Sequence, residues 1–488
     1  MIPRNKQIRD YETVARSRKR IDSRAKSVRV FESRPKNEVS AALNTATPAL
    51  VIDERPLLKR GHFFSFTCLF LFTLVLYARP AEFYPSAATN SLALIIGVIT
   101  LATFVGTQLT LEGKLTARPS EVNFVMLFML MALLSIPLAI DRSIAWGEFT
   151  NTFVRGILIF IVIVNVVRTP SRLKALLFLS IVTALVLSVQ AMNDYRLGLN
   201  TVEGYRAAGR GTGLFGNTND MALFLVTMLP ISVAFFFQSK RAARKAIHAA
   251  CAAMMLAGIV LSYSRGAFLG MVLMVVFFAI KIGRRSKFEI GALLVVGILA
   301  MLLLAPSGYG DRLLSILIPA LDPNGSADAR RGELFRSAYV ALRHPLLGIG
   351  MGNYQPNMSY NGLVTHNSYT QVGSEMGLIA LGLYTMFLVT PLRKLAAIAR
   401  QTFAQPDDAE LHYLALGLQA SLLVFMVSSF FLSVAYAWNV YYLVGYAVCF
   451  RKIYESKTGR FVVLERKRST GNSDEVRNEA VHHEPAVA

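Results

Sequence analysis

Apolar residues form long, unbroken runs along the chain, separated by short polar and charged segments. Residues 87–106 carry no charged side chain, and residues 288–305 carry only Glu289. Runs of this length cross a hydrocarbon core of about 30 Å as α-helices. The strands of a membrane β-barrel would instead alternate apolar and polar positions, which these runs do not. The pattern therefore predicts an all-α, polytopic membrane protein.

About twelve transmembrane helices are predicted from these runs. Their expected ranges are 62–78, 87–106, 122–140, 152–167, 173–193, 219–238, 246–263, 266–282, 288–305, 372–391, 411–432 and 434–450. The last two share one apolar stretch, which must be divided near residues 433–439.

The helices divide the chain into three parts. Residues 61–450 form the transmembrane domain, between basic tails at 1–60 and 451–488. The first tail is polar and poor in aromatic residues, so it is expected to be disordered. Two outer loops, 194–218 and 306–371, are long enough to form a site outside the membrane, and a helix is expected within the second, between helices nine and ten.

The charge is concentrated at the tails. The chain is 54% hydrophobic and 17% charged, whereas a soluble domain carries about 25% charged residues. The net charge is +21, and residues 1–60 alone hold 15 Lys and Arg against 7 Asp and Glu. Basic tails and basic inner loops beside anionic lipid account for this excess, so membrane lipids are expected partners and nucleic acid is not.

Basic residues in the loops predict that both termini are cytoplasmic. The short inner loops would hold 16 basic residues, seven of them lysine. The outer loops hold 11, and all are arginine: Arg79, Arg142, Arg196, Arg206, Arg210, Arg265, Arg312, Arg330, Arg331, Arg336 and Arg343. Guanidinium groups bind phosphate and carboxylate oxygens in bidentate pairs. The skew therefore indicates an anionic ligand on the outer face.

Residues 327–343, within the second long loop, have the spacing of an amphipathic helix. One stripe with two aromatic residues beside it contains Leu334, Ala338, Leu342, Phe335 and Tyr339. Such a helix is expected to lie at the membrane surface or over the bundle. Arg330 and Arg331 fall in its first turn, where the helix dipole disfavours each cation by roughly 0.3–1 kcal/mol. A functional role for them is therefore suspected.

Three polar clusters are expected on the outer face. They are residues 210–220 (RGTGLFGNTND), residues 263–266 (YSRG), and a third cluster that runs from Arg331 through HPLLGIGMGNY at 344–354 to Thr-His-Asn at 365–367 and Glu375. In this order the clusters resemble the O-antigen ligase and O-antigen polymerase superfamily of bacterial membrane glycosyltransferases, most strongly over residues 206–382. Ala380 departs from the ligase-type pattern, which tends to have Gly, Thr or Tyr there.

The resemblance implies a donor glycan on undecaprenyl diphosphate and a glycan or lipid acceptor. Expelling the diphosphate requires a metal ion or arginines to stabilise its charge. The first outer loop, 79–86, has a single acid, so we expect no metal and no cofactor. The resemblance points to Arg210, Arg265 and Arg331 as diphosphate-binding residues.

A base is also needed for the acceptor hydroxyl. His366 is the candidate, because its ordinary pKa is near neutral. Glu375 is a second candidate, or the partner that orients the imidazole. Alternatives remain at each position: Arg210 could be confused with Arg196 or Arg206, and Arg330 competes with Arg331.

The expected enzyme is a metal-independent glycosyltransferase of the bacterial inner membrane. A polymerase is slightly preferred over a ligase to lipid A core or a protein O-oligosaccharyltransferase, and other polysaccharide-assembly membrane proteins are candidate partners. The alternative is a transporter or flippase of a lipid-linked or anionic substrate. Transporters place ionisable residues near the bilayer midplane, whereas the predicted helix centres here are almost free of charge.

Overall fold

The computed structural model describes residues 61–113, 115–209, 214–282, 308–314 and 325–462, with positions 288, 291, 295 and 318. Most of these residues are helical. The described part includes ten helical segments long and apolar enough to cross a membrane, which confirms the prediction of an all-α polytopic membrane protein. The expected ninth helix, 288–305, and most of both tails lie outside the described residues.

The long helices follow the predicted runs closely. They are α2 (Phe63–Ala78), α4 (Ala87–Glu112), α5 (Ser120–Ser135), α7 (Val154–Val166), α8 (Pro170–Leu197), α9 (Thr218–Gln238), α10 (Ala242–Leu261), α11 (Arg265–Ile282), α16 (Ser368–Thr402), α17 (Ala409–Ser428) and α18 (Trp438–Thr458). The predicted division near 433–439 is confirmed, because α18 begins at Trp438 after a short 3₁₀ turn, η5 (Ser429–Phe431).

Short elements lie between the long helices. They are α3 (Pro80–Phe83), η1 (Ile136–Leu138), α6 (Arg142–Glu148), the π-helical η2 (Phe149–Phe153), α13 (Tyr309–Leu314), α14 (Ser326–Arg343), α15 (Tyr354–Met358) and η4 (Pro406–Asp408). A two-stranded hairpin pairs β1 (Thr201–Val202) with β2 (Arg206–Ala207) in antiparallel register.

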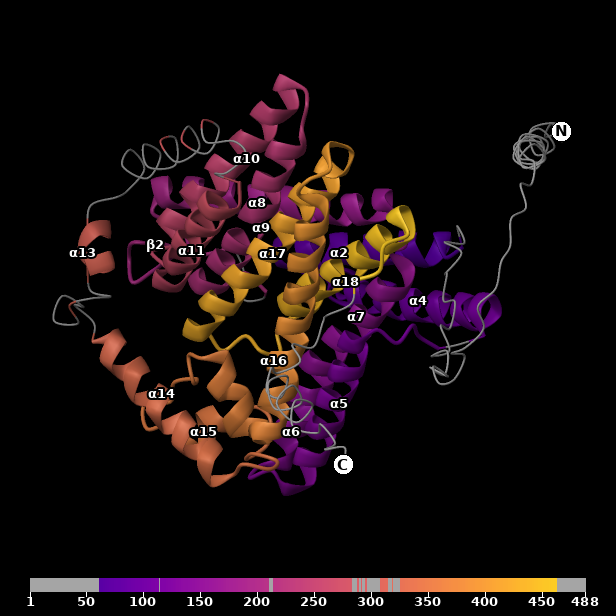
Figure 1. Cartoon of the computed structure of the whole chain (residues 1–488). Coiled ribbons are helices and arrows are strands. Elements are labelled where there is room, and N and C mark those ends of the chain that lie inside the picture. The colour runs from indigo at the N-terminus through magenta and orange to yellow at the C-terminus, as the bar shows by residue number, and fades with distance from the viewer. Residues whose placement is uncertain are drawn as a thin grey trace, which may run out of the picture. The chain divides into compact units, whose positions relative to one another are not determined.

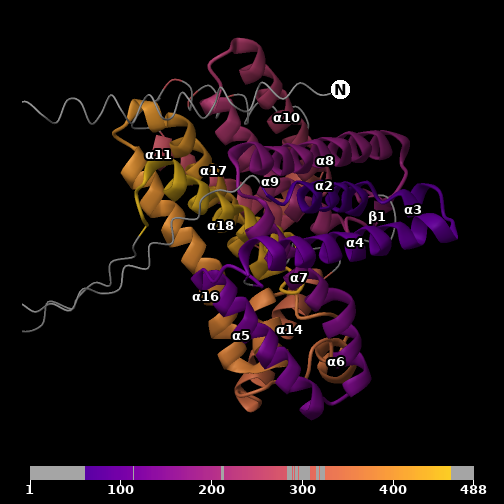
Figure 2. The same cartoon turned by 90° about the vertical axis from the view of Figure 1, so that its right-hand side faces the viewer.

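The helices differ in how far the protein encloses them. The most apolar stretch of α9 is 89% buried, between α10 and α17, whereas that of α4 is only 17% buried. Leu94 and Val98 of α4 accordingly face outward, as expected of a helix that faces lipid. Figure 2 shows α2 running alongside α4, with which it packs.

The loops gather at two ends of the bundle. The tail end comprises the described residues nearest the two tails, 61–62 and 459–462, with the loops at 115–119, 167–169, 239–241 and 403–408. The motif end comprises residues 79–86, 139–141, 198–209, 262–264, 308–314, 325–367 and 429–437. Hydrogen bonds join loops within each end: Arg172 Nη1 donates to the Gly61 carbonyl (3.1 Å) at the tail end, and the Asp141 amide donates to Asn353 Oδ1 (2.8 Å) at the motif end.

At the motif end, α16 is broken at Gly377, where φ is 87° and ψ is 173°. The loop after α14 enters this break: the Leu378 amide donates to the Pro345 carbonyl (2.7 Å), and the Gly350 amide to the Glu375 carbonyl (2.9 Å). A Cβ at Gly377 would lie 2.4 Å from the Leu346 carbonyl oxygen. Glycine is therefore required for the loop to satisfy the backbone groups that the break exposes. Figure 1 shows α14 and α15 beside this part of α16.

Candidate active site

The turn between α10 and α11 presents Arg265. Tyr263 adopts the left-handed backbone conformation (φ 51°), and α11 begins two residues later at Arg265, which is half-buried. Gly266 packs against η5: a Cβ there would lie 3.1 Å from Phe431 Cβ, and Ser428 Oγ donates to the Gly266 carbonyl (3.1 Å). The turn is thereby fixed to the end of α17.

Two further arginines bind the carbonyls of this turn. Arg206 Nε donates to the Ser262 carbonyl (3.2 Å), and Arg312 Nε donates to the Tyr263 carbonyl (3.2 Å). Cations are favoured there, because the last carbonyls of a helix carry partial negative charge. Glu203 joins the two guanidinium groups, at 3.2 Å from Arg206 Nη1 and 3.3 Å from Arg312 Nη1. We call Glu203, Arg206 and Arg312 the arginine clamp.

The groups around Glu203 keep its side chain ionised. Burial alone would raise the pKa of Glu203, but the hydrogen bond from Tyr205 and the charges of Arg206 and Arg312 outweigh it and lower that pKa. Burial, and then the charge of Arg312, lower the pKa of Arg206. Among the described residues, two buried cations thus share the carboxylate of Glu203.

The clamp also connects to the first predicted cluster. Arg206 Nη2 donates to Asn219 Oδ1 (2.9 Å), and the Asn217 side chain caps α9 by accepting from the Asn219 amide (2.8 Å). Phe215 is buried against Tyr77, at 6.1 Å between ring centroids. The cluster therefore supports the clamp, whereas Arg210 itself lies outside the described residues.

The sequence interpretation missed two members of the clamp. Arg312 and Glu203 were not predicted, and Arg206 appeared only as an alternative to Arg210. The arginine-only composition of the outer loops was the signal for Arg312, but no motif surrounds it. Its carboxylate partner is 109 positions away in the sequence.

His366 lies in a turn held by the next residues. It adopts a left-handed conformation (φ 51°) directly before Asn367, whose side chain accepts from the amides of Tyr369 and Thr370 (both 2.9 Å) and caps α16. Asn367 Nδ2 also donates to the Phe430 carbonyl (2.9 Å). The turns that carry Arg265 and His366 therefore both pack on η5.

The imidazole of His366 is half-buried beside α14. Burial, and then the positive charge of Arg330, lower the pKa of His366 to about 4, while Glu333 acts in the opposite direction. The ring is therefore neutral near pH 7, and a neutral imidazole can accept a proton.

Glu375 lies further along α16 and does not meet His366. Its Oε2 accepts from the Tyr436 hydroxyl (2.9 Å), and its Oε1 from the Tyr354 amide (3.4 Å). The seven helical steps from Ser368 to Glu375 correspond to about 10 Å along the axis, and His366 lies before the helix begins. The structure thus separates the two predicted catalytic side chains, and the buried carboxylate of Glu375 connects the loop at 354 to that at 436.

The two adjacent arginines of α14 lie on different sides of the helix. The inward side carries Glu333, which accepts from the Tyr354 hydroxyl (2.6 Å), and Ser337, which donates to the Thr370 hydroxyl (2.8 Å). Arg330 is half-buried and acts on His366. Arg331 is exposed and lies 5.9 Å from the ring centroid of Phe335. Arg330, not Arg331, therefore faces the candidate base.

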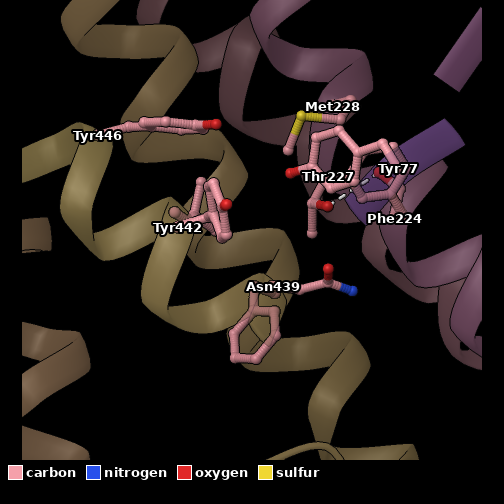
Figure 3. Close-up of a pocket in the computed structure, with 9 residues that line it drawn as sticks. Tyr77, Phe224, Thr227, Met228, Asn439, Tyr442 and Tyr446 are labelled. Atoms are coloured by element: carbon pink, nitrogen blue, oxygen red, sulfur yellow. Dashed lines mark hydrogen bonds between the residues drawn. The ribbon is translucent and has the colours of Figure 1, made fainter. Parts of the chain in front are cut away.

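No group of His, Cys, Asp and Glu side chains that could hold a metal ion occurs in the described part of the chain. An interior pocket lies between α2, α9, α17 and α18, where Figure 3 shows Tyr442 and Tyr446 projecting toward Thr227 and Met228. Its lining, as far as the structure describes it, includes none of the candidate residues. The Tyr442 hydroxyl is hydrogen-bonded to that of Thr73 (2.9 Å), so we assign this pocket to helix packing.

A protein-family model matches part of the chain. Residues 249–385 match the family model described as O-antigen ligase, a range that runs from α10 into α16 and includes Arg265, Arg330, His366 and Glu375. The search of curated proteins gave no match. The fold and the match together define a multi-pass membrane protein in which residues 249–385 are similar to the O-antigen ligase family. The predicted relation to the O-antigen ligase superfamily is confirmed.

Proposed function

We propose that this protein transfers an oligosaccharide from a polyprenyl diphosphate to a glycan or lipid acceptor, at the periplasmic face of the bacterial inner membrane. The family match supports a function of the O-antigen ligase or polymerase type in general. The observation that carries the proposal is the meeting of two turns on η5, one presenting Arg265 and the other His366. A cation and a neutral base thus lie at the same end of the bundle.

In the proposed reaction, the acceptor hydroxyl attacks the anomeric carbon of the donor sugar. The hydroxyl proton passes to the imidazole of His366, and the bond from the anomeric carbon to the diphosphate oxygen breaks, so that the diphosphate leaves with the bonding electrons. Arg265, Arg330 and Arg210 would stabilise the developing negative charge through charge-assisted hydrogen bonds. Arg330 takes the role expected of Arg331, because Arg330 faces His366. Glu375 stays the second candidate base.

A polymerase is our preferred assignment, ahead of a ligase to lipid A core or a protein O-oligosaccharyltransferase. The preference rests on Ala380, which departs from the ligase-type pattern.

The rival is a transporter or flippase, and one structural feature favours it. The break of α16 at Gly377, beside the buried carboxylate of Glu375, is of a kind that transporters use to bind substrate. Loop 345–350 fills this break with backbone hydrogen bonds, which supports a structural role for it instead.

The test is a transfer assay with purified protein in proteoliposomes that contain a synthetic oligosaccharide on undecaprenyl diphosphate. We expect elongated or transferred product in excess EDTA, because arginines neutralise the leaving group. Translocation of the donor without product would favour the transporter. Loss of activity in EDTA that Mg²⁺ or Mn²⁺ restores would contradict the arginine mechanism.

Within this assay, Arg265→Ala should lower the rate of transfer by ~10²–10³. Arg265→Lys should recover only part of the loss, since lysine supplies the charge without the planar donor pair. Lys174→Gln, which removes a cation paired with Glu410 at the tail end, is the matched control and should transfer at the wild-type rate. Equal rates for Arg265→Ala and Lys174→Gln would place the diphosphate elsewhere.

A further inference from the structure

The outward face of α14 is apolar although α14 is not one of the membrane-spanning helices. Its inward side packs on α16 through Ser337, whereas Phe335 is 63% exposed, Tyr339 56% and Leu342 71%. Leu342 and the two aromatic residues beside the predicted stripe are therefore turned away from the protein, whereas Leu334 and Ala338 are half-buried. Contiguous exposed side chains of this size mark a binding surface.

Two arginines frame this apolar face. Arg331 lies 5.9 Å from the ring centroid of Phe335. Arg343 lies 5.3 Å from that of Tyr339 and donates from Nε to its hydroxyl (2.8 Å). Aromatic rings with guanidinium groups beside them are typical of helices that lie at the boundary between acyl chains and phosphate headgroups.

The acids of α14 lie away from this face or at its start. Glu333 is buried on the inward side, and Asp328 lies in the first turn. From Arg331 to Arg343 the outward face is cationic and apolar, so its charge complements an anionic headgroup.

The same face continues the surface of a membrane-spanning helix. Leu346, 67% exposed, follows the end of α14, and its carbonyl oxygen lies within 2.4 Å of a Cβ built at Gly377 of α16. The next residues of α16, Leu378 and Ile379, are exposed as well, and Leu378 is hydrogen-bonded to Pro345. Lipid that covers α16 beside Leu378 and Ile379 would therefore also contact Leu346 and the adjoining end of α14. Figure 1 shows α14 and α16 on this side of the molecule.

We propose that α14 lies in the headgroup region of the bilayer and binds anionic phospholipid through Arg331, Phe335, Tyr339, Leu342 and Arg343. The apolar side chains enter the acyl boundary, and the guanidinium groups bind the phosphates. The opposite side of α14 carries Arg330 and Glu333 beside His366. Lipid binding to the outward face therefore fixes the position of Arg330 and Glu333 relative to His366. The proposal is independent of the reaction that the protein catalyses.

The experiment places a tryptophan on the face in the full-length protein, in nanodiscs of defined lipid. The chain's two tryptophans, Trp146 and Trp438, are replaced by phenylalanine, and Phe335→Trp is added. The matched control is Tyr360→Trp in the same background, because Tyr360 is 84% exposed in the same outer segment and contacts α14 at Arg336, outside the proposed lipid-binding residues. Brominated phosphatidylglycerol, brominated phosphatidylcholine and aqueous acrylamide serve as quenchers, after folding is confirmed by size exclusion.

We expect brominated lipid to quench the Phe335→Trp variant and acrylamide to quench the Tyr360→Trp control. Phosphatidylglycerol should quench more than phosphatidylcholine, and adding Arg331→Gln should reduce that preference about fivefold. Three results would overturn the proposal. The first is acrylamide quenching of the Phe335→Trp variant as strong as in the control, and the second is lipid quenching that does not depend on headgroup charge. The third is protection from all three quenchers, which would mean that a second copy of the protein covers the face.

Discussion

The two ends of the helix bundle use charged residues differently. At the tail end, ion pairs join different helices: Glu121 contacts Lys394 (2.9 Å) and Arg451 (3.7 Å), and Arg168 contacts Glu112 (2.5 Å). At the motif end, Arg206 and Arg312 share Glu203 alone among the described residues, and three arginines of α14 lie over aromatic rings.

The difference separates charges that join helices from charges that lie beside the candidate site. Paired charges at helix ends cancel each other, so they contribute to packing and attract no anion. Arg206 and Arg312 at the motif end bind the turn that carries Arg265, so we expect the loss of these contacts to affect transfer more than folding. The comparison therefore separates residues whose loss should unfold the protein from residues whose loss should stop transfer.

The largest effect is expected from removing the base at the motif end. His366→Ala should lower turnover at saturating donor by ~10²–10⁴, because the proposed acceptor of the hydroxyl proton is removed. Donor affinity should change little, since the arginines are intact. Turnover and donor binding are measured separately on folded protein. Wild-type turnover in this variant would move the role of base to Glu375 or to the substrate.

At the tail end, Glu121→Gln should instead affect folding. The Glu121 side chain is fully buried between Lys394 and Arg451, and losing one partner of a buried charged group costs about 3–5 kcal/mol. We expect a lower unfolding temperature in detergent but wild-type turnover per folded molecule. A large fall in turnover without any loss of stability would remove the distinction between the two ends.

The same substitution at the motif end sharpens the comparison. Glu203→Gln leaves two arginines without their shared carboxylate, but Glu203 is partly exposed, so the loss of stability should be smaller than for Glu121→Gln. Turnover should fall roughly tenfold, because the clamp would no longer hold the turn that presents Arg265 and small displacements of a binding group are costly. If Glu203→Gln keeps wild-type turnover, the clamp does not position Arg265.

Much of the fold could be predicted because its signal is local. Apolar runs of the right length identified α9 and α11 to within one residue at each end, against expected ranges of 219–238 and 266–282. The break of α16 could not be predicted in this way, because its cause is distant in the sequence. Gly377 leaves the helical conformation only because loop 345–350 supplies the missing hydrogen bonds.

The site shows the same division between local and distant signals. Arg265 and His366 stand in short motifs, so the resemblance could propose them as candidates. The arginine clamp depends on contacts between residues that are far apart in the sequence, and such contacts cannot be predicted from the spacing of residues within a motif. The choice between Arg330 and Arg331 was a matter of helix phase: adjacent positions differ by 100° around the axis, and the apolar stripe gave no sign of which side packs on the protein.

The smallest effect is a shift in pH dependence that separates these two arginines. Burial and the charge of Arg330 hold the pKa of His366 at about 4, so the acid limb of turnover at saturating donor should lie well below pH 6. Arg330→Gln removes the cation but leaves the burial. The pKa should then rise toward its ordinary value of about 6.5 without reaching it. The imidazole accepts a proton only when neutral, so the acid limb should move to higher pH.

The matched control is Arg331→Gln, which removes the same charge one residue further along, from the exposed side of α14. Its acid limb should stay in place, whatever happens to lipid binding. Glu333→Gln should move the limb in the opposite direction to Arg330→Gln, because Glu333 raises the pKa of His366. Equal shifts for Arg330→Gln and Arg331→Gln would mean that the site responds to net charge alone. His366 would then lie outside the local field of Arg330, and α14 would not cover the site in the way that its contacts with Tyr354 and Thr370 indicate.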